Sequence, residues 1–411
     1  MSTFLCRATV CLFSFVVLSS AGTRFFPPLG DTAWATVAPE ALGWQTSMLE
    51  PLYEYLDSND TRAFIVLKGG KIAIEKYFGT FTKDSLWYWA SAGKTITALT
   101  VGIALQEKLL TLGDRTSKWL GSGWTSCTSG QESLITLRHQ LTMTSGLDDA
   151  VTDPFCTDPA CLSYRADAGT RWAYHNGPYT LLDKVIETAA GRTMNAYFAA
   201  KVRNRIGMNG AFVKSGYNNV YYSTARSMAR FGLLILNRGN WDGTTILSDT
   251  AYFRQMTTPS QDINKSYGYL WWLNGKTSHM VPQSQVVFPG PLCPNAPPDM
   301  IAALGKNGQF IDVAPSLDLV FVRMGDVPVS VDVPFLMNDE IWKMLNPVIG
   351  TNAIHRAQAT TRILPSTKTN ALPRIYDIRG KLLRGDYRSS GSGIVIRVLG
   401  RASTTLCFCS K

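Results

Sequence analysis

Long apolar runs are missing from the interior of this chain of 411 residues, and charged residues and histidines are scarce. A membrane helix needs about 20 consecutive apolar residues, and the lack of such a segment excludes a multi-span membrane protein. Eight cysteines are too few for a small scaffold built on disulfides. Apolar residues still make up 45% of the chain, which allows a sizeable core and excludes a disordered chain.

Several motifs of common catalytic sites are also missing. The chain contains no H-E-x-x-H, no Cys/His spacing typical of zinc, and no G-x-S-x-G. Gly93-Lys94-Thr95 resembles the end of a phosphate-binding loop, but that loop needs a glycine where this chain has Tyr88. We therefore expect no metal, no organic cofactor, no bound nucleotide and no α/β-hydrolase fold.

The positive charge is concentrated at the C-terminal end. The chain has 40 Lys and Arg against 30 Asp and Glu, a net charge of +10, and a pI near 9.2. Residues 351–411 contain 11 Lys and Arg and 2 Asp and Glu, so they carry +9 of this charge and the rest of the chain only +1. This neutral body argues against nucleic acid as its partner.

The first 21 residues are typical of a secretory signal peptide. Arg7 precedes an apolar stretch over 8–18, and small residues occupy the −3 and −1 positions of a cleavage site after Ala21. The alternative is a buried N-terminal helix. We expect an exported protein, either secreted or at the periplasm or cell surface, without a transmembrane span. Cys156 and Cys161 could then close a short disulfide loop or remain free thiols, and the sequence favours neither.

The main body, residues 40–346, is expected to begin and end with strands around a helix-rich middle. Two apolar, β-branched runs separated by Gly69-Gly70 predict a hairpin. The expected elements in chain order are strands at 63–68 and 71–78, helices at 92–109, 177–190, 194–205 and 225–237, strands at 299–304, 308–313 and 317–323, and a helix at 333–346. This order predicts an α/β or α+β sandwich whose sheet takes strands from both ends of the body.

The main chemical signal is Ser91-x-x-Lys94 at the start of the helix expected over 92–109. Positions i and i+3 of a helix share a face. A serine hydroxyl becomes a nucleophile when a base lies beside it, and a lysine with a lowered pKa can be that base. The helix start also makes the Ser91 N–H a candidate oxyanion donor. The alternative is a surface lysine near a capping serine, which the surrounding aromatic and apolar residues disfavour.

A second candidate element is Tyr174-His175-Asn176, just before the helix expected over 177–190. In an extended segment Tyr174 and Asn176 point to the same side. Tyr174 could then pass a proton to a leaving group, and Asn176 could donate to a substrate carbonyl. His175 points the other way, and we interpret it as structural. Taken alone, Tyr174 would be better explained as a buried tyrosine at a loop–helix junction.

In combination, Ser91-x-x-Lys94 and Tyr174-x-Asn176 resemble the serine β-lactamase superfamily. The closest similarity is to the branch of class C β-lactamases, D-aminopeptidases, related esterases and 6-aminohexanoate-oligomer hydrolases. Further stretches similar to that branch are 139–147, 222–232 and 305–309. The resemblance covers residues 40–346. It implies a β-lactamase/transpeptidase-type fold, with an antiparallel sheet flanked by helices and a helix-rich subdomain, and a serine hydrolase in which Lys94 and Tyr174 activate Ser91.

The third motif of that family, Lys-Thr-Gly or His-x-Gly on a strand beside the site, is missing. By position it falls near Met300-Ile301-Ala302, which has neither a cation nor a hydroxyl. The resemblance implies that the Ala303 N–H is the second oxyanion donor, with Gly305 also at the substrate. The group that holds a substrate carboxylate is lost, so an esterase or amide hydrolase is favoured over a β-lactamase or D,D-peptidase.

The aromatic segment 267–274 has two interpretations of equal weight. Trp271 and Trp272 could wall an apolar substrate pocket, or they could belong to a core strand.

The C-terminal end is expected to be a separate unit. Residues 347–371 lack periodicity and predict a linker, and short strand-like runs in 372–411 predict a small β-module. Segments 376–380 and 392–397 resemble the C-terminal sorting modules of type IX-like secreted bacterial proteins, which implies a secretion machinery as partner. The alternative is a basic module that binds anionic surface polymers.

These observations together predict an exported serine hydrolase that acts on a small ester, amide or peptide. One alternative is a non-catalytic, penicillin-recognising or surface-binding protein on the same fold. Another is a nucleic-acid or polymer binder that depends on the basic tail.

Overall fold

The computed structural model describes residues 24–30, 33–328 and 332–350, and four short strands between residues 374 and 408. The expected signal peptide and most of the expected linker therefore lie outside the described residues. Within the described part of the chain, no helix is both long enough and apolar enough to cross a membrane.

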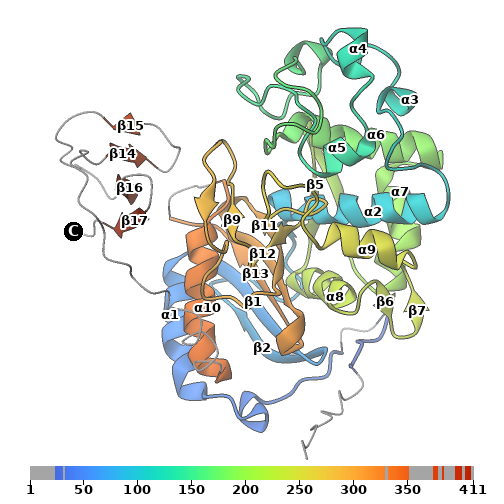
Figure 1. Cartoon of the computed structure of the whole chain (residues 1–411). Helices are drawn as coiled ribbons and strands as arrows, with labels where there is room; N and C mark the ends of the chain where they lie inside the picture. Colours follow the sequence, from blue (N-terminus) through green and yellow to red (C-terminus); the bar gives the residue numbers. More distant parts are fainter. Residues whose placement is uncertain are drawn as a thin grey trace, which may run out of the picture.

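One antiparallel sheet of six strands forms the centre of the body (Figure 1). Its order is β2 (Lys71–Tyr77), β1 (Thr61–Lys68), β13 (Leu319–Gly325), β12 (Gln309–Ala314), β11 (Ile301–Gly305) and β8 (Trp272–Leu273). β1 pairs with β13, with Val66 opposite Phe321, so strands from the two ends of the body are neighbours. This arrangement confirms the predicted sheet and its N-terminal hairpin.

In chain order, most of the helices lie between the N-terminal hairpin of the central sheet and its C-terminal strands. They are α1 (Leu49–Ser58), α2 (Lys94–Gln106), α3 (Ser117–Leu120), α4 (Ser129–Glu132), α5 (Leu137–Leu141), α6 (Asn176–Ala190), α7 (Met194–Lys201), α8 (Ala225–Leu236), α9 (Thr250–Met256) and α10 (Phe335–Ile349). Short 3-10 turns are η1 (Pro39–Leu42), η2 (Thr46–Met48), η3 (Ala90–Gly93), η4 (Pro159–Cys161), η5 (Arg203–Arg205), η6 (Lys306–Gly308) and η7 (Pro315–Leu317).

Helices cover both faces of the sheet, and the remaining helices form a second lobe beside it (Figure 1). On one face, α8 approaches so closely that a Cβ at Gly232 would lie 2.6 Å from Cγ1 of Val320. On the other face, the Trp342 ring of α10 lies 5.2 Å from the ring of Phe321. Successive residues of a strand point to opposite faces, so β13 contributes to the core on both sides.

Smaller sheets complete the structure. They are β3 (Trp87–Tyr88) with β5 (Asn218–Ser223) and β4 (Ala211–Ser215), β6 (Asn240–Trp241) with β7 (Thr244–Thr245), β9 (Ser278–His279) with β10 (Phe288–Pro289), and the C-terminal sheet of β14 (Arg374–Asp377), β15 (Leu382–Leu383), β16 (Ile394–Leu399) and β17 (Ser403–Phe408). The strand-like runs predicted in the tail therefore coincide with β14, β16 and β17.

Several element boundaries differ from the prediction by a few residues, and the ends of two helices are examples. The helix expected over 194–205 ends at Lys201, and the separate turn η5 follows it. The last helix continues to Ile349, so the first three residues of the expected linker belong to α10. Gly350 then ends this helix in the left-handed conformation, with φ of 77°, which glycine adopts without strain.

Candidate active site

Short pieces of backbone hold Ser91 at the entrance to α2. β3 pairs with β5, and the Trp89 N–H donates to the Tyr221 carbonyl at 2.8 Å. Ala90 then adopts a φ of 47°, a left-handed conformation that costs about 1 kcal/mol or more for a residue with a side chain. This turn places Ser91 in η3, directly before α2. Strain of this kind is often kept where it orients a reactive group.

Lys94 connects Ser91 with the start of α6. Its side chain is 4% exposed, and its Nζ donates to Ser91 Oγ at 2.8 Å and to Asn176 Oδ1 at 2.7 Å. The first bond joins positions i and i+3 on one face, as the sequence predicts, and the second crosses from α2 to α6. The structure therefore brings these three predicted residues together.

Two tyrosine rings enclose the lysine ammonium group. The Nζ of Lys94 lies 5.0 Å from the ring centre of Tyr174 and 4.4 Å from that of Tyr179, within the range of cation–π contacts. The hydroxyl of Tyr174 is hydrogen-bonded to the hydroxyl of Ser91. The predicted Tyr174 therefore lies against both predicted catalytic groups.

Burial changes the acid–base character of this group of side chains. Desolvation lowers the pKa of Lys94 to about 7, although the carboxyl of Asp183 acts in the opposite direction. Desolvation also raises the pKa of Tyr174, while its bond to Ser91 opposes the rise. Near neutral pH, Lys94 can therefore exist without its extra proton, and Tyr174 keeps its proton. A lysine in that state can accept a proton, and the tyrosine can donate one.

Asp183 is a residue of this site that the sequence reasoning missed. It accepts hydrogen bonds from Thr97 Oγ1 at 3.3 Å and from Asn219 Nδ2 at 2.9 Å, and desolvation raises its pKa to about 7. It follows Asn176 by two helical turns on α6, and Thr97 follows Lys94 by one turn on α2. The i+7 spacing was the available signal, because it places an acid on the same helix face as Asn176.

The end of β11 lies against the backbone of Ser91. A Cβ at Gly305 would lie 2.6 Å from the Trp89 carbonyl oxygen and 3.1 Å from Ser91 N, which only glycine avoids. Ala303, the residue expected here, lies two positions earlier, is fully buried, and is not part of the cleft lining, whereas Lys306 is. The structure therefore places the predicted Gly305, followed by Lys306, beside Ser91, and Ala303 outside the cleft lining. Ala303 lies too early on β11 to reach Ser91, and it was predicted there because no motif in the sequence marks which residue of this strand adjoins Ser91.

These groups open into a cleft of about 510 Å³. It is lined by Ser91, Asp149, Ala150, Val151, Pro154, Phe155, Arg171, Tyr174, Asn176, Pro282, Gln283, Ser284, Gln285, Lys306, Asp332 and Val333. This volume is sufficient for a small-molecule substrate. Among the described residues, no cluster of three or more His, Cys, Asp or Glu side chains is arranged to hold a metal ion.

The two tryptophans proposed as pocket walls belong to the core. Trp271 is fully buried and stacks on Phe231, and Trp272 is 2% exposed. Neither contributes to the cleft lining. Trp272 instead supports the site from behind, since its ring is stacked on that of Tyr174 at 5.7 Å. Of the two interpretations of this segment, the structure agrees with the core strand.

The other stretches that resemble the family, and His175, lie around the site and do not line the cleft. In the 139–147 stretch, Gln140 Nε2 donates to the Pro178 carbonyl at 2.6 Å and so fixes the first turn of α6. The 222–232 stretch forms most of α8 and packs on the sheet away from the cleft. His175 is 1% exposed, and desolvation lowers its pKa to about 4, so the ring is neutral near pH 7. It does not line the cleft.

Comparisons with known proteins agree with this geometry. The family model described as Beta-lactamase matches residues 61–333. No curated protein matches the chain significantly. Among solved structures, a protein of Bacteroides dorei DSM 17855 described as a beta-lactamase is similar with a TM-score of 0.60 and 18% identity, over 75% of this chain and 99% of that one.

Two further solved structures are similar to this chain. One is described as a 6-aminohexanoate-dimer hydrolase from Bacillus anthracis, with a TM-score of 0.60 and 19% identity over 80% of this chain and 89% of that one. The other is a penicillin-binding protein homologue from Pyrococcus abyssi, with a TM-score of 0.52 and 17% identity over 88% and 89%. At these identities the similarity concerns the fold alone.

Proposed function

The chain belongs to the beta-lactamase family, and from this premise we propose that it is a serine hydrolase that cleaves an ester or amide through an acyl-enzyme on Ser91. One observation carries the proposal. The Nζ of Lys94 is buried between Ser91 Oγ and Asn176 Oδ1, at the inner end of a cleft that a substrate can enter. A surface lysine beside a capping serine would have neither the burial nor the second partner.

Acylation begins with neutral Lys94. As Ser91 Oγ forms its bond to the substrate carbonyl carbon, the hydroxyl proton passes to Nζ, and the carbonyl π electrons move onto the oxygen. That oxyanion needs N–H donors. We assign the first to Ser91 and the second to Lys306, in place of Ala303, because Gly305 brings the end of β11 against Ser91 N.

The tetrahedral intermediate then releases its leaving group. When the carbonyl re-forms, the bond to the leaving oxygen or nitrogen breaks, and the Tyr174 hydroxyl donates a proton to that atom. The ammonium of Lys94 returns a proton to Tyr174, so the pair is restored. Water attacks the acyl-enzyme by the reverse route, giving the acid product and free Ser91. Acylation uses only protons that Ser91 and Tyr174 already hold, and in deacylation the attacking water supplies the proton that restores the Ser91 hydroxyl.

The proposed substrate is an ester or a simple amide. The segment of β11 before Gly305 contains Ala302, Ala303 and Leu304, which offer neither a cation nor a hydroxyl. A β-lactam or D-peptide carboxylate would therefore lack the usual partner on this strand. The names of the similar structures do not select a substrate, since they span beta-lactamase, 6-aminohexanoate-dimer hydrolase and penicillin-binding homologue.

Export is also part of the proposal. It depends on the signal-like segment 1–21 and on the likeness of segments 376–380 and 392–397 to sorting modules, whose partner would be a secretion machinery. N-terminal sequencing of the protein recovered outside the cytoplasm would test cleavage after Ala21.

A fluorophosphonate probe tests the nucleophile. We expect mass spectrometry to find the label on Ser91 of the folded protein, with no label on the Ser91→Ala variant at the same melting temperature. The labelled protein would then be examined with p-nitrophenyl esters, D-peptides and nitrocefin. Absence of label on folded protein would favour a non-catalytic binding protein on this fold, and label on another serine would show that the site lies elsewhere.

A further inference from the structure

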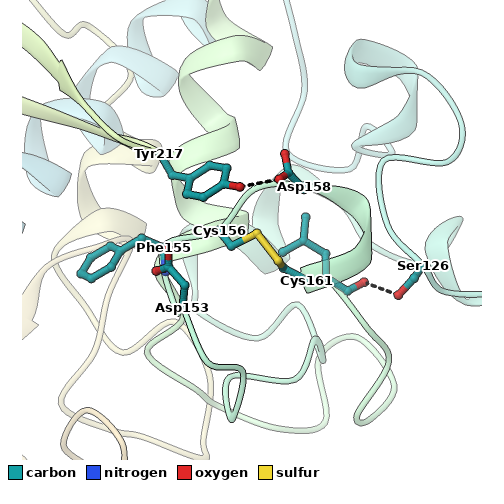
Figure 2. Close-up of a disulfide and its surroundings, with 8 residues drawn as sticks. Ser126, Asp153, Phe155, Cys156, Asp158, Cys161 and Tyr217 are labelled. Carbon is teal, nitrogen blue, oxygen red and sulfur yellow. Dashed lines mark hydrogen bonds between the residues drawn. A yellow bond between two sulfur atoms is a disulfide. The ribbon is translucent and has the colours of Figure 1, made fainter.

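One wall of the cleft is a loop that a disulfide closes. The Asp148 N–H donates to the Ser163 carbonyl at 2.9 Å and joins the two ends of the loop. Within it, Cys156 and Cys161 are bonded (Figure 2), which resolves the pairing that the sequence left open. On the outer side the Tyr217 hydroxyl donates to Asp158 (Figure 2). The loop is therefore held at its base, across its middle and from outside.

The same loop is attached directly beside the reacting groups. The Gly177 N–H donates to the Pro154 carbonyl at 3.0 Å. A Cβ at Gly177 would lie 2.5 Å from the Cys156 carbonyl oxygen, so the loop packs on the bare backbone of α6. Gly177 follows Asn176, the partner of Lys94. The position of the loop is thus fixed relative to the proposed nucleophile.

Phe155 is the apolar side chain that this attachment leaves exposed. It lies between Pro154 and Cys156, its N–H donates to Asp153 Oδ1 at 2.9 Å, and its ring is 37% exposed while lining the cleft. In Figure 2 the ring points away from the disulfide. Single exposed apolar residues are common on protein surfaces, but this one has a fixed backbone and faces the active site.

Other apolar groups continue this surface, and three of the four charged groups that line the cleft interact with each other or with a neighbouring side chain. The cleft lining includes Ala150, Val151 and Pro154 from the same loop, and Pro282 and Val333 from elsewhere in the chain. Arg171 Nη2 lies 2.6 Å from Asp149 Oδ1, and Gln283 donates to Asp332. An apolar group can therefore be buried against the loop without breaking the Arg171–Asp149 ion pair or the Gln283–Asp332 hydrogen bond.

From these contacts we infer that Phe155 determines specificity, by taking an uncharged apolar substituent, aromatic or branched, next to the scissile bond. The disulfide holds the ring in that position. This inference rests on the proposed hydrolase function and adds the substrate class, namely esters or amides with an apolar group on one side of the carbonyl. The gain in binding free energy comes from apolar area that the substrate removes from water at a surface that is already ordered.

Two series of esters test the inference. The first varies the acyl group of p-nitrophenyl esters over acetate, butyrate, benzoate and hemisuccinate, and the second varies the alcohol of acetate esters over ethyl, butyl and benzyl. In at least one series we expect kcat/KM to rise roughly fourfold per buried methylene. Phe155→Ala should reduce kcat/KM for the largest ester about 5- to 50-fold, mainly through KM, and change the smallest less than threefold.

Matched variants distinguish the contribution of the Phe155 ring to the substrate preference from that of the loop. Phe155→Leu should keep most of the preference, and Leu134→Ala, which removes another exposed apolar side chain outside the cleft, should keep all of it. The double variant Cys156→Ser/Cys161→Ser should lose the preference as Phe155→Ala does, whereas Cys127→Ser, at a free cysteine, should not. If the double variant fails to fold, the Phe155 variants keep the disulfide and decide the question.

Several results would overturn the inference. They are a flat dependence on group size in both series, an unchanged preference in Phe155→Ala, or a preference for the hemisuccinate, whose carboxylate would point to Lys306 instead. Fluorophosphonate labelling distinguishes these failures from failure of the proposed function. If Ser91 is labelled and kcat/KM does not depend on the size of the ester group, only the role of Phe155 is refuted. If Ser91 is not labelled, the hydrolase proposal is refuted as well.

Discussion

Two buried aspartates show how neighbours, more than burial, determine the role of a polar group in this protein. Burial raises the pKa of both Asp183 and Asp312 to about 7. Asp183 lies in the helical lobe between α2 and α6, where it acts on the pKa of Lys94. Asp312 lies on β12 and accepts from Asn338 Nδ2 at 3.1 Å and Trp342 Nε1 at 2.7 Å, both on α10.

The difference follows from what each carboxyl faces. An acid beside a buried lysine couples two titrations, and such coupling is typical of sites that move protons. An acid between two neutral N–H donors satisfies them and fastens a helix to a sheet, which is a structural task. We therefore expect changes around Asp183 to affect chemistry and changes at Asp312 to affect stability.

The largest effect should come from Lys94→Met. The variant removes the base and keeps an unbranched apolar side chain in the same space, so kcat/KM for p-nitrophenyl butyrate should fall by a factor of about 1,000 or more. Thermal unfolding should occur at an equal or higher temperature, because a desolvated amine is removed. A loss of activity that simply follows a loss of folded protein would contradict the assignment of Lys94 as the base.

Asp312→Ala, in contrast to Lys94→Met, should lower stability and leave activity nearly unchanged. It leaves the N–H groups of Asn338 and Trp342 without their acceptor in the core and opens a small cavity, which costs about 2–4 kcal/mol of unfolding free energy. In a domain of this size that corresponds to a fall in Tm of about 3–6 °C. Activity per folded molecule should remain within about twofold of the parent protein. A large change in kcat of fully folded Asp312→Ala would contradict the distinction between a structural Asp312 and a functional Asp183.

Asp312 should also affect how stability depends on pH. Its pKa is higher in the folded than in the unfolded chain, so the unfolded chain loses this proton first as pH rises. The contribution of Asp312 is thus fully present below about pH 4 and is lost as pH rises to about 7, with a slope of at most about 1.4 kcal/mol per pH unit. Urea unfolding at pH 4–8 should show a flatter dependence for Asp312→Asn. Equal slopes would mean that Asp312 is ionised in the folded protein.

Much of the fold could be predicted from the sequence because its signals are local. The hairpin at Gly69-Gly70 and the helix after Ser91 follow from residue periodicity, and the Ser91, Lys94 and Tyr174 cluster follows from motif spacing. Partners that depend on the three-dimensional path could not be predicted. The Cys156–Cys161 bond is an example, since spacing allowed both a disulfide and free thiols.

The remaining differences have equally physical causes. Ala303 and Gly305 were both predicted beside Ser91, but only a glycine can approach Ser91 N so closely, so Gly305 occupies this position and Ala303 does not. Trp271 and Trp272 fit a pocket wall and a core strand equally well, because both produce the same run of apolar residues. Asp183 was overlooked because an acid two turns into a helix usually faces solvent, and only its packing against α2 shows otherwise.

The smallest effect, and the sharpest form of the comparison, is a shift in a pH profile. The proposed mechanism needs neutral Lys94, so kcat/KM should fall on the acid side with an apparent pKa near 7 that belongs to the coupled Lys94–Asp183 pair. Asp183 favours the protonated lysine, and Asn219, Thr97 and Glu187 are its other polar neighbours.

Asp183→Asn should therefore move the acid limb to lower pH by up to about one unit, which raises kcat/KM at pH 6 by up to about fivefold and leaves the rate at pH 8 within about twofold. Asp312→Asn is the matched control, because it neutralises an equally buried acid that does not act on Lys94, and its limb should stay in place. If Asp183→Asn only lowered the plateau, without moving the limb, its role would be structural like that of Asp312. The two buried acids would then differ in position and not in function.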